Sequence, residues 1–341
     1  MLSGFALGFV CWSGGTSANA AGVFGNTGLS GCFRWDAAPR TNAGNERSLG
    51  GGIRYSMQGG SYAGLFSQFT FSGGVTVTDS QLAVEEAFNA WTVTDPATGL
   101  TTALSFTPDF ATTAVGLGDN MNGGLNTNGA EIDLFAYNDG FFWNLGNTGQ
   151  QGETRFQAAG GPVTLTSGTT GYNAGAIIGS DIILNRGATY DLSVFRLLLS
   201  HEIGHSLGFA DVDITSGLNG TFIDDNYDGT SNATAAAATL NNSWALLVNP
   251  LNPAASVGLS SYTVLNGQPG TKSNGVNILM ESQGLGGQFG DLTPLSNHDY
   301  GGRQFPYPSL NVAVVPEAGT LALLADGAGL LGAVIARRRR A

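Results

Sequence analysis

Two of the three histidines in this sequence, His201 and His205, stand four residues apart, with Glu202 between them. Apolar residues recur at helical spacing ahead of them, so we expect a helix from Asp191 to about Gly208. Residues four apart on a helix lie one turn above one another, so both imidazoles would share a face. Two neutral imidazoles so placed can hold a zinc ion, and Glu202 can take a proton from a metal-bound water.

The alternative interpretation is a buried amphipathic helix whose histidines only satisfy hydrogen bonds in the core. The scarcity of histidine in the chain argues against it. A catalytic zinc also needs a third protein ligand and one open position for water. Gly208 can adopt a backbone conformation that ends the helix and turns the chain back, which would bring Asp211 within reach of the metal. His298, the one remaining histidine, is the other candidate for third ligand.

The segment from His201 to Asp211, HEIGHSLGFAD, resembles the zinc-binding motif of the metzincin metalloproteases. It is similar to the variant of snapalysin-like enzymes, in which an aspartate replaces the usual third histidine. The resemblance implies that His201, His205 and Asp211 bind zinc and that Glu202 is the general base. It also implies an α/β (α+β) fold, with a twisted, mostly parallel sheet and two helices above the cleft and a methionine turn below it. An edge strand of that sheet would hold an extended polypeptide substrate.

Two later stretches resemble further parts of a metzincin domain. The turn at Met280 is similar to the one that places a methionine beneath the zinc, although an ordinary core methionine is the alternative. Residues 295–301 are similar to the start of the last helix, where His298 and Asp299 would cap the helix and support the methionine turn. In that role His298 does not bind zinc, so the resemblance favours Asp211 as the third ligand.

Strand-like and helical patterns precede the motif in the order that such a domain needs. We expect strands at residues 53–57, 131–136 and 177–186 from their alternating or continuous apolar runs. We expect a helix at residues 79–92, where apolar side chains recur on one face, and a short strand at residues 103–106. This helix and the short strand together resemble the first long helix and second strand of a metzincin domain.

Composition separates this chain from nucleic-acid-binding proteins. Its 341 residues include 53 glycines, only 11% are charged, and the net charge is −12. The single lysine is Lys272, and four of the arginines are crowded into residues 337–340, so no basic face exists to neutralise phosphates. A Gly-rich, acidic chain of this kind is typical of a secreted, loop-rich protein, and we expect no nucleic-acid partner.

A long insertion, at about residues 212–275, follows the zinc motif and is rich in Gly, Asn, Ser and Ala. We expect surface loops there. Within it, the segment from Asp224 to Asp228 places oxygen-bearing side chains at positions 1, 3 and 5 of a calcium-binding loop, with Gly229 at position 6. Position 12 is Ala235, where such a loop needs an acid, so bound Ca²⁺ and a plain Asx-rich turn are both open.

The N-terminal segment predicts export. Residues 2–12 are mostly apolar, and residues 18–20 (Ala-Asn-Ala) form a cleavage site, so we expect residues 1–20 to be a signal peptide. The segment lacks a charged start, and a buried N-terminal strand is the alternative. Cys11 would be removed with it, so the mature chain would keep only Cys32 and form no internal disulfide. The catalytic domain would then span residues 21–312.

The C-terminal segment, residues 313–341, has the three parts of a sorting tail. A Pro-Glu pair is followed by an apolar run from Thr320 to Ala336 and by the arginine cluster at residues 337–340. The pattern resembles a PEP-CTERM sorting signal, with Ala318 where proline is usual. The resemblance implies a transient transmembrane anchor that an exosortase-like processing protease removes, so we expect the protein at the cell surface or outside the cell. A permanent tail anchor is the alternative.

These features together predict a secreted zinc-dependent endopeptidase that hydrolyses peptide bonds with metal-activated water. Two other functions fit the same motif. One is a non-catalytic surface or extracellular-matrix protein that zinc stabilises, and the other is an amidase acting on a non-protein polymer. Glu202 argues against the first, because a scaffold has no need of a general base between its metal ligands.

Overall fold

The structure is a computed structural model of the chain. It describes residues 33–94, 101–112, 114, 129–138, 151–164, 166, 175–211, 221–223, 261–263, 279–280, 295, 299, 302–303, 306–307 and 309. The chain divides into two compact units, residues 1–310 and residues 311–341, and every described residue belongs to the first.

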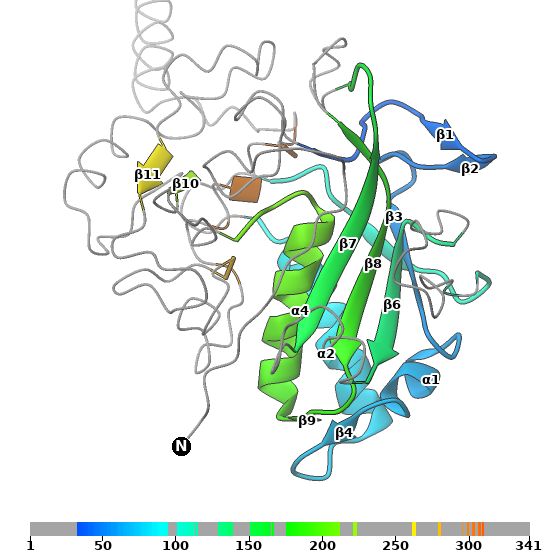
Figure 1. The fold of residues 1–341 in the computed structure, drawn as a ribbon, viewed down its shortest axis with the longest axis vertical. Coiled ribbons are helices and arrows are strands. Elements are labelled where there is room, and N and C mark those ends of the chain that lie inside the picture. The colour runs from blue at the N-terminus through cyan, green and yellow to red at the C-terminus, as the bar shows by residue number, and fades with distance from the viewer. Residues whose placement is uncertain are drawn as a thin grey trace, which may run out of the picture. The chain divides into compact units, whose positions relative to one another are not determined.

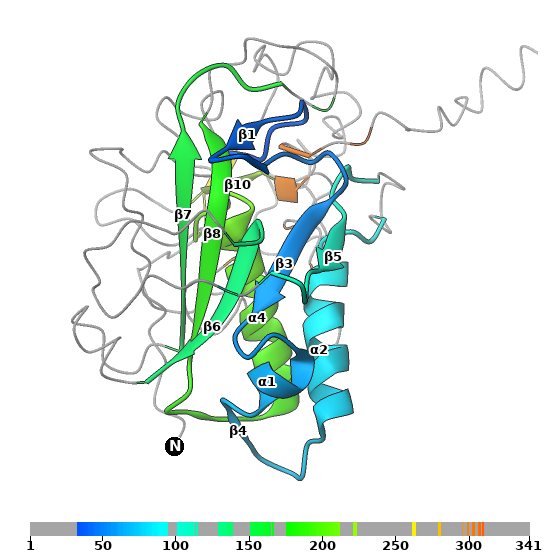
Figure 2. The ribbon, with the colours of Figure 1, turned by 90° about the vertical axis from the view of Figure 1, so that its right-hand side faces the viewer.

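The largest sheet among the described residues has five strands (Figures 1 and 2). Its order is β5-β3-β6-β8-β7, with the bounds β5 Phe106–Pro108, β3 Ile53–Met57, β6 Ile132–Tyr137, β8 Ala176–Asn185 and β7 Gly152–Ala159. The pairs β3–β5, β3–β6 and β6–β8 are parallel, whereas β7 runs antiparallel to β8. The sheet is therefore mixed, with β5 and β7 as its two edges.

Two long helices accompany the sheet. α2 spans Val77–Ala90 and begins at a capping box, in which Thr76 and Asp79 exchange hydrogen bonds between side chain and backbone. α4 spans Leu192–Ser206, and Asp191 caps its start. The caps satisfy amide groups of the first turn, which have no partner within the helix.

The remaining elements are short. They are α1 Tyr62–Phe66, β1 Thr41–Asn42, β2 Asn45–Glu46, β4 Thr70–Phe71, β9 Thr189–Tyr190, β10 Thr221–Ile223 and β11 Ser261–Thr263. The pairs β1–β2 and β10–β11 are antiparallel, and β4–β9 is parallel. The insertion predicted after the zinc motif thus contains at least one strand pair, β10–β11.

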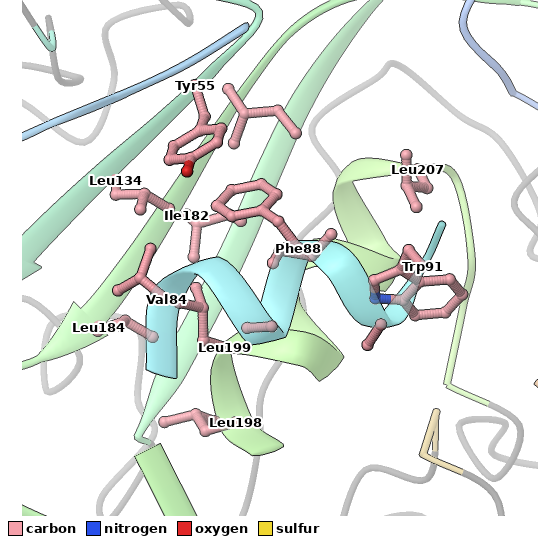
Figure 3. Close-up of a cluster of buried hydrophobic side chains, with 14 of the residues drawn as sticks. Tyr55, Val84, Phe88, Trp91, Leu134, Ile182, Leu184, Leu198, Leu199 and Leu207 are labelled. Carbon is pink, nitrogen blue, oxygen red and sulfur yellow. The ribbon is translucent and has the colours of Figure 1, made fainter. Parts of the chain in front are cut away.

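The face of the sheet toward the helices is apolar. Tyr55 of β3, Leu134 of β6 and Ile182 of β8 belong to one buried cluster with Val84 and Phe88 of α2 (Figure 3). The rings of Tyr55 and Phe88 stack with their centroids 3.9 Å apart. α4 contacts α2, β7 and β8, so this layer also fixes the helix that carries the zinc motif.

The opposite face of the sheet carries polar and charged side chains that are nevertheless buried. Ser56 of β3, Asp133 of β6, Asp181 of β8 and Arg155 of β7 are direct neighbours across four strands. Each is less than a tenth exposed. The hydroxyl of Ser56 donates a hydrogen bond to the carboxylate of Asp133. We call these four residues the polar row.

The prediction of a mixed α/β fold is confirmed, and the details differ. The helix expected at residues 79–92 is α2, Val77–Ala90, which begins and ends two residues earlier. The strand expected at residues 103–106 is instead β5, Phe106–Pro108, because the amide of Ala103 donates its hydrogen bond to the carbonyl of Tyr307 and not to a strand. The antiparallel edge strand β7 was not predicted. It escapes the apolar pattern because charged Glu153 and Arg155 are buried beside weakly apolar neighbours.

Several predicted features fall on residues that the structure does not describe. They are the signal peptide at residues 1–20, Cys32, the segment from Asp224 to Asp228, His298 and the tail at residues 313–341. Among the described residues, no helix has the length and apolar character that a membrane span requires.

Candidate metal centre

His201, His205 and Asp211 converge at the C-terminal end of α4. The two imidazole rings have their centroids 4.6 Å apart. Nε2 of His201 lies 3.1 Å from Oδ1 of Asp211, and Nε2 of His205 lies 3.2 Å from the same oxygen. All three side chains are buried. Within the described ranges, these residues are the one group of three or more His, Cys, Asp and Glu side chains close enough to share a metal ion.

The other ring nitrogen of each histidine bonds a backbone carbonyl. Nδ1 of His201 lies 2.7 Å from O of Leu279, and Nδ1 of His205 lies 2.8 Å from O of Phe209. A carbonyl oxygen only accepts hydrogen bonds, so each Nδ1 must carry the hydrogen. In a neutral imidazole Nε2 then has a lone pair, and both Nε2 atoms approach an oxygen of Asp211 that is also an acceptor. Three acceptors in such close contact need a cation between them.

The spacing of these atoms suits a zinc ion. Ligand atoms at the usual zinc bond lengths in a tetrahedron lie about 3.3 Å from one another. The two nitrogen–oxygen distances here are 3.1 and 3.2 Å. Among the described residues, neither Nε2 of His201 nor either carboxylate oxygen of Asp211 has a hydrogen-bond partner. Two imidazoles and one carboxylate therefore fit the three protein ligands of a catalytic zinc site, with the fourth position left for water or substrate.

The three groups also perturb one another's ionisation. Burial disfavours the imidazolium form of His201, but the close contact with Asp211 and its negative charge outweigh burial and raise the pKa of His201 to about 9. Burial likewise disfavours the Asp211 carboxylate, but the charges and contacts of His205 and His201 hold the pKa of Asp211 below its usual range. Both shifts favour a positive charge inside the cluster, which either a proton or a metal ion can supply.

Gly208 turns the chain so that Asp211 comes back to the histidines. Its φ is 93°, in the left-handed region that favours glycine. Its amide donates a hydrogen bond to O of His205, which closes the helix. A Cβ at this position would also collide with the carbonyl oxygen of Phe33. The backbone conformation and the close approach both require glycine.

A turn at Leu279 and Met280 packs against α4 at the level of the histidines. The Met280 sulfur lies so close to Gly204 that a Cβ there would collide with it. The carboxylate of Asp299 accepts hydrogen bonds from the amides of Leu279, at 3.0 Å, and Met280, at 3.4 Å. Because the carbonyl of Leu279 holds Nδ1 of His201, Asp299 orients this imidazole through the turn.

Glu202 lies beside the cluster and against the edge strand β7. It is 1% exposed, and its Oε2 accepts a hydrogen bond of 2.7 Å from the hydroxyl of Thr154. A Cβ at Gly152 would collide with its Oε1. Burial raises the pKa of Glu202, and the charges of His205 and His201 offset that shift only in part. A carboxylate with a raised pKa is a stronger base than an exposed one, which suits proton abstraction.

Residues far apart in the chain hold the C-terminal end of α4. Nε1 of Trp35 donates a hydrogen bond of 3.1 Å to O of Ser206, and the hydroxyl of Tyr307 donates one of 2.7 Å to O of Leu207. The same hydroxyl accepts a hydrogen bond of 3.1 Å from the amide of Trp35. These bonds satisfy carbonyls of the last turn, which have no partner within the helix. Hydrogen bonds to Trp35 and Tyr307 therefore hold the end of α4, from which the chain leads to Asp211.

The structure brings the described site predictions into one place. The residues gathered there are His201, Glu202, His205, Gly208, Asp211 and Met280. His298, the alternative third ligand, lies outside the described residues.

Two residues at the site, Gly152 and Thr154, escaped the sequence analysis because β7 was not predicted. The signal that could have found them is the alternation along Gly152–Ala159, in which every second residue faces the helices.

Comparison of the chain with protein-family models, with curated proteins and with solved structures finds no match.

Proposed function

We propose that this protein is a zinc-dependent endopeptidase. The observation that carries the proposal is the convergence of two Nε2 atoms and the Asp211 carboxylate, all buried acceptors at zinc-like spacing. A buried glutamate, Glu202, lies directly beside them. This combination of three ligands and a neighbouring base is the constellation that metal-assisted hydrolysis of an amide requires.

Each residue of the centre would have a separate role in the reaction. His201, His205 and Asp211 would hold zinc through Nε2, Nε2 and a carboxylate oxygen. When bound, the zinc ion would act as a Lewis acid that activates water and polarises the scissile carbonyl. Glu202 would accept the proton from the water and return it to the leaving amine. An aspartate ligand makes the site less positive than a third neutral histidine would.

The finer fold assignment, a metzincin-like catalytic domain, belongs to the same proposal. Three features support it: the mixed sheet with one antiparallel edge strand, the glycine turn at Gly208 that leads to Asp211, and the turn at Met280 beneath the histidines. β7 is that edge strand and contacts α4. An extended polypeptide that added to it by backbone hydrogen bonds would pass close to Glu202.

The N-terminal and C-terminal segments suggest where the protein would work, and we include that location in the proposal. Residues 1–20 would direct export, residues 21–312 would form the catalytic domain, and residues 313–341 would anchor it until an exosortase-like protease removed the tail. A calcium ion at Asp224–Asp228 is a further proposal that rests on the sequence alone.

Zinc content and casein cleavage test the proposal on the full chain, with Glu202→Ala as the matched variant. We expect one zinc per chain in both proteins and cleavage by the wild type alone, because the substitution removes the base and keeps the ligands. One zinc with no cleavage of any protein offered would favour the zinc-stabilised scaffold or the amidase. A chain without zinc would contradict the central claim.

A further inference from the structure

Two residues of the edge strand β7, Gly152 and Thr154, form the surface against which the carboxylate of Glu202 packs, and we call these two residues the seat of Glu202. Side chains alternate along a strand, so Gly152 and Thr154 lie on the same face of β7. The pairing of Thr154 with Ile182 of β8 places this face toward the helices. The hydroxyl of Thr154 donates a hydrogen bond to the carboxylate of Glu202, and the absence of a side chain at Gly152 leaves room for that carboxylate.

The contacts of this seat are specific. Oγ1 of Thr154 lies 2.7 Å from Oε2 of Glu202 and 3.0 Å from the backbone O of the same residue. A hydroxyl has one hydrogen, so it serves one of these acceptors at a time, and the shorter distance is to the carboxylate. On the other side, any Cβ at position 152 would displace Oε1.

We propose that Thr154 is a positioning residue that holds the carboxylate of Glu202 in its working orientation, with Gly152 leaving the space for it. This inference rests on the proposed function, since it assigns Thr154 to the general base of that reaction. A glutamate side chain has several rotatable bonds, and a carboxylate that samples several rotamers spends less time aligned with the water. The hydroxyl removes that freedom without touching the metal ligands.

A purely structural role for Thr154 gives different expectations. If its hydroxyl only satisfies a polar contact between β7 and α4, replacing it lowers stability and leaves the kinetics of the folded enzyme alone. The two roles therefore separate in kcat, KM, zinc content and melting temperature measured on the same preparations.

The kinetic test compares Thr154→Val, Thr154→Ser and the control Thr107→Val. Valine keeps the shape and removes the hydroxyl, serine keeps the hydroxyl, and Thr107 carries an exposed side chain on β5, the opposite edge of the sheet. We expect Thr154→Val to lower kcat about 10- to 100-fold, with KM and zinc content little changed. Thr154→Ser should recover most of the loss. Wild-type kcat in Thr154→Val, or a loss that follows zinc content, would overturn the proposal.

A double-mutant cycle on melting temperature tests the contact without any activity. Thr154→Val is measured in the wild type and in Glu202→Ala. If the hydroxyl holds the carboxylate, the cost of Thr154→Val should be about 2–4 °C smaller once Glu202 is gone. Additive shifts would overturn the proposal. If the wild type cleaves no protein, the proposed function fails, and the cycle alone still decides whether Thr154 holds Glu202.

Discussion

Among the buried carboxylates of the described residues, those of the candidate metal centre and those of the polar row have different surroundings. At the metal centre, Asp211 faces the Nε2 atoms of two imidazoles whose hydrogens are directed to backbone carbonyls. In the polar row on the other side of the sheet, Asp133 accepts a hydrogen bond from Ser56. Asp181 stands there between Asp133 and Arg155 in the strand register. One place gathers acceptors, and the other intersperses acceptors with donors.

The difference shows that burial of acids does not by itself indicate a metal site. Burial and the neighbouring Asp133 raise the pKa of Asp181 well above its usual range, and Arg155 offsets this only in part. Asp181 can therefore be neutralised by a proton, as buried acids often are. At the metal centre two lone pairs and a carboxylate meet at one point, so an ion between them satisfies all three at once. The two places differ in where the hydrogen-bond donors point. At the metal centre the Nδ1 hydrogens point away from the carboxylate, whereas in the polar row Ser56 donates to Asp133.

Loss of a carboxylate should affect zinc binding at only one of the two places. We expect Asp211→Ala to weaken zinc binding by at least about 100-fold, because a direct ligand is lost where even supporting residues matter tenfold or more. Asp181→Ala, which removes an equally buried acid, should leave zinc affinity unchanged. Competition with a chromophoric chelator measures both. Equal losses would mean that Asp211 is not a ligand.

Removal of the metal should destabilise the protein through the centre alone. We expect a chelator to lower the melting temperature by about 10 °C, since an ion bound far above its dissociation constant adds several kcal/mol to the folded state. Asp211→Ala should melt at the same temperature with and without chelator. A chelator effect of the same size in that variant would place the metal elsewhere.

The metal-free protein should acquire a pH dependence that the zinc-loaded protein lacks. The pKa of His201 is raised from 6.5 to about 9 in the folded state, so the folded protein binds the proton more tightly than the unfolded chain does. Its contribution is complete below pH 6.5 and is lost as pH rises through 9. We expect the free energy of unfolding to fall by on the order of 3 kcal/mol over this window.

Urea unfolding of the chelated protein at several pH values measures this dependence, with Asp211→Ala as the control that lacks the partner charge. A flat profile for the chelated wild type across that window would show that the imidazole and the carboxylate do not share a proton.

The smallest effect is expected in the polar row. Asp181→Asn keeps the shape and removes the need for a proton, so it should raise the free energy of unfolding at pH 7 by ~1 kcal/mol. A raised acid pKa costs stability above the unfolded pKa, so the advantage of asparagine should vanish as pH falls below about 4. Denaturant unfolding at pH 7 and pH 4 tests it. A variant less stable than the wild type at pH 7 would mean that Asp181 is charged and paired.

Sequence patterns predict the parts of this protein whose signals are local. His201, Glu202 and His205 lie within one helical turn and a half, and their spacing on α4 places the two imidazoles on one face. Strands β3, β6 and β8 carry alternating or continuous apolar patterns and lie within a residue or so of their predicted positions. Such signals need no knowledge of distant residues.

The parts that escaped prediction depend on contacts between distant residues. β7 contributes Gly152 and Thr154 to the seat of Glu202, about fifty residues away in the sequence, and its buried charges hide its strand pattern. β5 begins later than expected because Tyr307 takes the hydrogen bond of Ala103. No short window of the sequence contains both partners of either contact, so the alternation along β7 could have indicated the strand but not its contact with Glu202.

The hydrogen bonds around the end of α4 also set when the centre can form during synthesis. The carbonyl that holds Nδ1 of His201 belongs to Leu279, 78 residues later, and the hydroxyl that bonds Leu207 belongs to Tyr307, 100 residues later. At typical rates of translation, a further 100 residues take about 5–20 s. His201 is thus synthesised well before the carbonyl that orients it exists, whereas the carbonyl that holds His205 belongs to Phe209, four residues later. The complete centre is therefore a late product of synthesis, so the proposed hydrolytic site would stay unfinished while its own chain is still unfolded.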